Sequence, residues 1–120
     1  MLVVSGCQKP GKVKLNGGEE MVIAEVSVIP IGTKTPSVSQ YVAEAVKVLA
    51  QEKGIKYQLT AMGTLVEGEL DEVLGVVKKM HQRTFDGEVK RVVTSVKIDD
   101  RRDKVSTMSH KVASVMEKLG

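Results

Sequence analysis

The sequence has few aromatic residues, a single cysteine and no long apolar run. Only 2% of its 120 residues are aromatic and none is tryptophan, which disfavours binding of single-stranded nucleic acid through base stacking. The net charge of +3 is mild and the basic residues are scattered among acids, which also argues against a duplex-binding surface. No apolar run approaches the ~20 residues that a membrane span needs. We therefore expect neither nucleic acid nor a membrane as a partner.

With Cys7 alone, the chain cannot form an internal disulfide, and a cytoplasmic location is the simplest expectation. The residues before Cys7 look like the end of a lipoprotein signal, but no basic segment and apolar core precede them. His81 and His110 have no neighbours at metal-ligand spacing, no nucleophile has a positioned base, and glycine-rich nucleotide fingerprints are absent. We predict no catalytic residues, no metal, no cofactor and no enzymatic activity.

Regular patterning begins at Met21. Residues 1–20 hold short apolar pieces separated by turn signals, and we interpret them as an N-terminal extension, either loose or folded as a small hairpin. Residues 21–120 are enough for one domain with its own core.

Hydrophobic periodicity predicts strands at 22–30, 55–62, 64–67 and 88–98, and helices at 37–53, 69–84 and 104–118. Around Met62-Gly63-Thr64 the second and third strands either turn as a hairpin or continue in line across a bulge. The first six elements follow the split βαβ order. We therefore expect an α+β fold, a ferredoxin-like βαββαβ sandwich with an additional C-terminal helix.

The ends of the first strand and first helix carry recognisable signals. Pro30 has no N–H to donate and is expected to end the first strand. Ser37 or Ser39 is expected to cap the helix that follows, and Gly54 to terminate it.

If both crossover helices cover one face of the sheet, alternate strand residues form an open second face. This face is too apolar for water and too polar for a simple core, which is typical of an association surface. We predict that the protein forms a homo-oligomer through it. The expected members are Ile23, Glu25, Ser27, Ile29, Gln58, Thr60, Met62, Arg91, Val93, Ser95 and Lys97.

Three clusters have side chains suited to ligand binding. The hydroxyl-rich turn at residues 32–37 can hold an anion or polar ligand with free helix N–H groups, or can simply cap the helix. Residues 62–64 place a thioether and a hydroxyl beside a glycine, either as a ligand contact or as a plain bulge. The charged run at residues 98–103 is either a solvated loop with its own salt bridges or a source of carboxylates and guanidinium groups for a ligand.

Three blocks of sequence in this order, VIPIGT…SVSQYV at 28–42, AMGTLVEG at 61–68 and VKIDDRRD at 96–103, resemble the small thiamine-binding-like proteins, which are related to the YkoF-type thiamine-binding proteins. The resemblance covers residues 21–119. It implies a ferredoxin-like protomer, sheet-to-sheet dimers that assemble into a homotetramer, no known catalytic activity, and binding of thiamine or its pyrimidine moiety.

Carried over by position, the resemblance implies a set of pocket residues, with Arg101 or Arg102 near it: Thr33, Ser37, Met62, Thr64, Glu67 and Asp99. Thiamine is a cation with an aminopyrimidine ring, so Glu67 or Glu25 could accept from the amino group, and Met62 and Ile29 could sandwich a ring.

Two hypotheses follow. The preferred one is a non-catalytic binding protein for thiamine or its hydroxymethylpyrimidine moiety. The alternative is an oligomeric regulatory or interaction module that binds another anion or metabolite at the Thr33/Ser37 turn. On the preferred hypothesis, Glu67→Gln weakens the binding of a cationic pyrimidine; on the alternative, it leaves the binding of an anion unaffected or makes it tighter.

Overall fold

The computed structural model describes residues 21–85, 88–104 and 107–120. The strands are β1 (Met21–Ile31), β2 (Lys56–Thr60), β3 (Gly63–Glu69) and β4 (Arg91–Asp100), and the helices are α1 (Ser39–Ala50), α2 (Leu70–Thr84) and α3 (Met108–Leu119). The expected extension at residues 1–20, with Cys7, lies outside the described residues.

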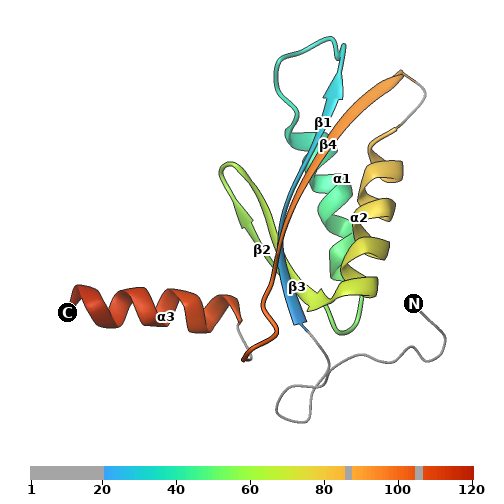
Figure 1. The fold of residues 1–120 in the computed structure, drawn as a ribbon. Coiled ribbons are helices and arrows are strands. Elements are labelled where there is room, and N and C mark those ends of the chain that lie inside the picture. The colour runs from blue at the N-terminus through green and yellow to red at the C-terminus, as the bar shows by residue number, and fades with distance from the viewer. Residues whose placement is uncertain (1–20, 86–87, 105–106) are drawn as a thin grey trace, which may run out of the picture.

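The strands form one antiparallel sheet in the order β2-β3-β1-β4. Figure 1 shows α1 and α2 against one face of this sheet and α3 on the opposite side, directed away from the body. The α+β, ferredoxin-like arrangement with an added C-terminal helix is confirmed. None of the helices in the described ranges has the length and apolar character that a bilayer crossing needs.

The core lies between the sheet and α1 and α2. It consists of alternate residues of the two central strands and one stripe from each helix: Val22, Ala24, Val26, Val66, Ala45, Val48, Leu49, Val73, Val76, Val77 and Met80. Within α2, Val76 is buried and Leu74 is exposed, so the helix turns its Val73, Val76, Val77 and Met80 side toward the sheet. By contrast, α3 buries no residue.

The predicted caps of α1 are wrong. Val38 occupies the N-cap position without a side-chain hydrogen bond, while the Ser37 and Ser39 hydroxyls contact each other at 3.3 Å. The helix ends at Ala50 rather than near residue 53, and Gly54 lies beyond its end in a turn with φ of 81°. The N-cap residue of this helix therefore offers no side-chain acceptor to its first free N–H groups.

Pro30 does not end β1, which continues to Ile31 with Pro30 opposite Val92 of β4. The reason is that β1 pairs with β3 only as far as Val26. Beyond that point one side of β1 has no neighbouring strand among the described residues, so a residue without an N–H can be accommodated.

Strands β2 and β3 form a hairpin, so the hairpin interpretation is correct and the in-line bulge is wrong. The pairing places Glu25 in one row with Gln58, Leu65 and Lys97 on the face opposite the core. The predicted open face is confirmed for its strand residues. Met62 is an exception because it lies in the hairpin turn, not on a strand.

Candidate functional site

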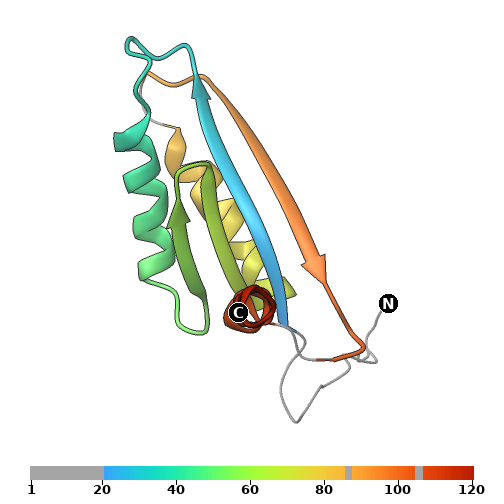
Figure 2. The same cartoon turned by 90° about the vertical axis from the view of Figure 1, so that its left-hand side faces the viewer.

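A pocket of about 640 Å³ lies between α1 and the tip of the β2–β3 hairpin. Figure 2 shows that this hairpin is shorter than β1 and β4, which run on past its tip. The pocket therefore lies open beyond the tip of the hairpin, where only β1 and β4 of the four strands continue. We call it the hairpin pocket, and it is lined by Val26, Ser27, Val28, Ile29, Ser37, Val38, Ser39, Val42, Ala43, Ala45, Val46, Leu59, Thr60, Ala61, Met62, Gly63, Thr64 and Met80.

The wall of the hairpin pocket is mostly apolar, with hydroxyl groups as its polar side chains. None of its described lining residues is charged. Thr64 is the most informative of them, because it is only 3% exposed and its hydroxyl has no hydrogen-bond partner among the described residues. A buried hydroxyl without a partner costs about 1–3 kcal/mol. A polar atom of a ligand or a water in the pocket would remove that cost.

The hairpin turn that edges the pocket is held by Thr60. Its hydroxyl donates to the Gly63 carbonyl oxygen at 2.8 Å and accepts from the N–H groups of Met62 at 3.2 Å and Gly63 at 3.1 Å. The Met62 side chain is left at the mouth of the pocket with 85% of its surface exposed. A flexible thioether in this position can close over a bound ring.

The hydroxyl-rich turn before α1 contributes only part of the pocket. The Thr33 hydroxyl donates to the Thr35 carbonyl oxygen at 2.6 Å, and the Thr35 hydroxyl accepts from the Ser37 N–H at 3.2 Å. Thr33 therefore serves the turn itself and does not line the pocket, while Ser37 and Ser39 lie on its rim.

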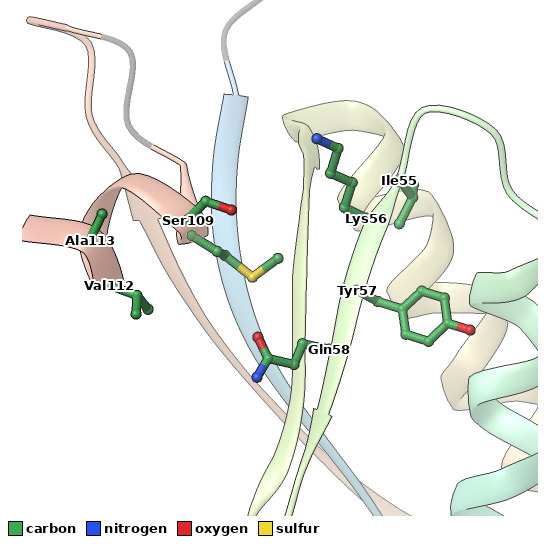
Figure 3. Close-up of a pocket in the computed structure, with 8 residues that line it drawn as sticks. Ile55, Lys56, Tyr57, Gln58, Ser109, Val112 and Ala113 are labelled. Atoms are coloured by element: carbon green, nitrogen blue, oxygen red, sulfur yellow. The ribbon is translucent and has the colours of Figure 1, made fainter. Parts of the chain in front are cut away.

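A second hollow, of about 810 Å³, lies between β2 and the start of α3. We call it the α3 groove, lined by Ile55, Lys56, Tyr57, Gln58, Met108, Ser109, Val112 and Ala113. Figure 3 shows the Gln58 side chain pointing toward α3, whereas the ring of Tyr57 points away toward the other helices. The groove is therefore formed on the open side of the sheet, opposite the core.

Glu67 and Asp99, both predicted ligand residues, lie on this open side and contact α3. Glu67 is 3% exposed and its Oε1 accepts from the backbone N–H of Met108 at 2.7 Å. Asp99 Oδ2 lies 2.8 Å from Lys111 Nζ. Because Glu67 is three residues from Thr64 on one strand, the two side chains point to opposite faces.

The remaining charged candidates, Glu25 and Arg101, are also away from the hairpin pocket. Glu25 lies on the open face, 3.7 Å from Lys97 Nζ. Arg101 forms a bidentate pair with Asp103, at 2.6 and 3.0 Å, and this hydrogen bonding raises the pKa of Arg101 and lowers that of Asp103. Both arginines of the charged run are thus paired within it, Arg101 with Asp103 and Arg102 with Asp100, whereas Asp99 pairs with Lys111 of α3.

Of the nine predicted residues, the structure brings four together in the hairpin pocket: Ile29, Ser37, Met62 and Thr64. Ile29 belongs to the open face by register but reaches the pocket where β1 runs past β3. Leu59 and Ser39 were missed as pocket residues. Leu59 pairs with Thr64 across the hairpin, so the alternation of β2 carried a signal that would have found it.

A family model described as thiamine-binding protein matches residues 24–116. The chain belongs to this family. It is 51% identical over 102 residues to the UPF0045 protein YqgV of Bacillus subtilis, with 82% of this chain and 98% of the relative covered. The family description places the chain among small binding proteins, as the sequence blocks had indicated.

Two solved structures support the same assignment. The crystal structure of Methanocaldococcus jannaschii MJ1052 matches with a TM-score of 0.75 at 44% identity, covering 82% of this chain and 98% of that one. A Bacillus cereus domain of unknown function matches with a TM-score of 0.67 at 39% identity, covering 78% of this chain and 88% of that one.

Within the described ranges, no group of three or more His, Cys, Asp or Glu residues is arranged to hold a metal ion.

Proposed function

We propose that this protein is a non-catalytic binding protein of the cytoplasm that holds thiamine, or its hydroxymethylpyrimidine moiety, in the hairpin pocket. The observation that carries the proposal is the buried residue Thr64, which lines a mostly apolar pocket and whose hydroxyl has no partner among the described residues. The membership of the family supports the choice of ligand.

The pocket suits an uncharged heteroaromatic ring. Its volume falls within the ~300–1,000 Å³ range of small-molecule sites. Apolar side chains from both sides, among them Met62 and Val42, can contact the faces of a ring, while Thr64 and Ser37 offer hydroxyls to its edge. We expect the aminopyrimidine to lie inside and the cationic thiazolium to lie at the mouth, since a buried charge would find no carboxylate on the described walls.

Calorimetric titration with hydroxymethylpyrimidine, thiamine and thiamine diphosphate tests the proposal. We expect heat with the first two, and a three- to tenfold weaker affinity in Thr64→Val, which is about the contribution of one neutral hydrogen bond. Thr84→Val is the matched control, because Thr84 is also buried but its hydroxyl donates to the Met80 carbonyl oxygen. No heat with any of the three compounds would refute the proposal.

The alternative ligand, an anion, is favoured by one observation: α1 has no side-chain cap, and its start lies on the rim of the pocket. Binding of thiamine diphosphate or inorganic phosphate without binding of hydroxymethylpyrimidine would establish this alternative. Salt dependence separates the two, because an anion would bind more weakly as the salt concentration rises.

We further propose that the protein forms a homodimer through the open face of the sheet, and that dimers pair into a tetramer. Ile29, Ile31 and Val93 support this, since all three are at least 40% exposed on one face. Light scattering on Val93→Lys, with Leu74→Lys on α2 at the other side of the sheet as control, tests the dimer. We expect monomers only for Val93→Lys; a wild-type monomer at micromolar concentration would contradict the proposal.

A further inference from the structure

The first turn of α3 is attached to the sheet at two points. Met108 and Lys111, which contact Glu67 and Asp99, are three residues apart and therefore lie on the same face of the helix. One helical turn thus reaches from β3 to β4, across the intervening strand β1.

The sheet register explains how both contacts form at once. Ile23 of β1 pairs with Glu67 on one side and with Asp99 on the other. The two acidic residues therefore lie in one row on the open face, separated by two strand spacings, or about 10 Å. Glu67 and Asp99 are 32 residues apart in the sequence, and only the pairing of the strands brings them into one row, where they act as the two anchors of α3.

The two anchors differ in strength. The Glu67 carboxylate is almost fully buried and receives a short, charge-assisted hydrogen bond from an N–H at the positive end of the helix dipole. The pair of Lys111 and Asp99 has about half of each side chain in solvent, where ion pairs contribute little. Glu67 is thus the main anchor.

Beyond its first turn, α3 is packed only loosely against the part of the chain that the structure describes. No residue of the helix is buried, and Figure 1 shows it leading away from the sheet. Thr107 caps the helix by accepting from the His110 N–H at 3.1 Å, so the helix has a local start of its own. The contact with Glu67 is therefore not needed to form the helix; it sets where the helix points.

We propose that Glu67 is a positioning residue that pins α3 to the open face, with Asp99 as the second point, and that the α3 groove exists only while this pin is in place. The inference rests on these contacts and is independent of what the hairpin pocket binds. Glu67 and Asp99, which the sequence predicted as ligand contacts, are thus assigned to the orientation of α3.

Nuclear magnetic resonance on the full chain tests the pin in Glu67→Leu, which keeps the bulk of the side chain and removes the acceptor. We expect hydrogen exchange of the Met108 amide to become roughly tenfold faster or more, since a hydrogen bond to a charged group is lost. We also expect that the residual dipolar couplings of α3 no longer fit the alignment tensor determined from α1 and α2. Glu25→Gln, on the same face but paired with Lys97, should change neither measurement.

A second pair of variants removes the donor in place of the acceptor. Met108 is the first residue of α3, a position where proline is tolerated, so Met108→Pro deletes the N–H without breaking the helix. Met108→Ala keeps the N–H and serves as the control for the lost side chain. Met108→Pro should reproduce the loss of common alignment and Met108→Ala should not. If α3 keeps the alignment of α1 and α2 in both Glu67→Leu and Met108→Pro, the inference is wrong.

Discussion

Thr64 and Glu67 are equally buried residues on the same strand, and they differ in whether the fold satisfies them. Both are 3% exposed on β3. Thr64 lines the hairpin pocket and its hydroxyl has no partner among the described residues, whereas the Glu67 carboxylate accepts from the Met108 N–H. A buried polar group that is already paired has a structural explanation, and one that is unpaired suggests a ligand. The comparison separates two residues that resemblance alone had placed in one pocket.

The hollows beside the two residues also differ, in how firmly their walls are held in place. The hairpin pocket is walled by elements that the core holds in place, namely α1 and the central strand β1. The α3 groove has one wall from the edge strand β2 and another from a helix that buries nothing. The first hollow is thus preformed by the core, whereas the shape of the second depends on how α3 is attached.

The largest expected effect comes from disturbing the hairpin that forms one wall of each hollow. A Cβ at Gly63 would lie 3.0 Å from the Val26 carbonyl oxygen, a backbone atom, so Gly63→Ala requires the hairpin and β1 to move apart by a few tenths of an ångström. We expect the free energy of unfolding to fall by about 1–3 kcal/mol, as for overpacked sites. Chemical denaturation measures the change, and ligand affinity should fall with it.

The matched control for that substitution is Gly75→Ala. Gly75 lies within α2, and a Cβ there meets no atom within 4 Å. Alanine should stabilise the protein by roughly 0.5–1 kcal/mol, because it loses less backbone entropy in a helix than glycine does. Equal effects of the two substitutions would show that the hairpin is not held tightly against β1.

A smaller effect should distinguish the buried threonines by stability alone, without ligand. Thr84→Val removes a hydroxyl that is hydrogen bonded to Met80, and we expect a loss of about 1 kcal/mol in the free energy of unfolding. Thr64→Val removes an unpartnered hydroxyl, so stability should stay the same or rise. If Thr64→Val costs as much as Thr84→Val, the Thr64 hydroxyl is already satisfied, and the comparison with Glu67 fails.

The smallest effect is expected at the charged run after β4. The pKa of Asp103 is lowered chiefly by its hydrogen bonds to Arg101. Any stabilisation from this pair is therefore fully present above the pKa of an aspartate in the unfolded chain. It is lost as the pH falls through the lower pKa that Asp103 has in the folded protein. Both groups are solvated, and Asp103→Asn should leave the melting temperature unchanged at neutral pH. The substitution should also leave ligand affinity unchanged. A clear loss of affinity would show that Arg101, which Asp103 holds, takes part in ligand binding.

Local pattern was sufficient for much of the fold. Alternation along the strands correctly placed Glu25, Ser27 and Val93 on the open face, because a strand exposes successive side chains on opposite sides. The caps of α1 could not be obtained this way. Ser37 and Ser39 have the right chemistry, but the path of the turn places Val38 at the N-cap position.

Within the candidate site, the opposite facing of Thr64 and Glu67 was contained in the sequence. An odd separation on one strand puts two side chains on different faces, whatever the surrounding fold. Short blocks such as AMGTLVEG at 61–68 also carried the resemblance to the family, whose model matches residues 24–116.

What only the tertiary structure decided is which buried group is satisfied. Met108 is 41 residues from Glu67 along the chain, and nothing in the local sequence of either indicates that they meet. The contact exists because three paired strands put Glu67 and Asp99 in one row and the chain after β4 returns across that row. Hydrogen-bond satisfaction depends on atoms that folding brings together, so the roles of Thr64 and Glu67 could be separated only in three dimensions.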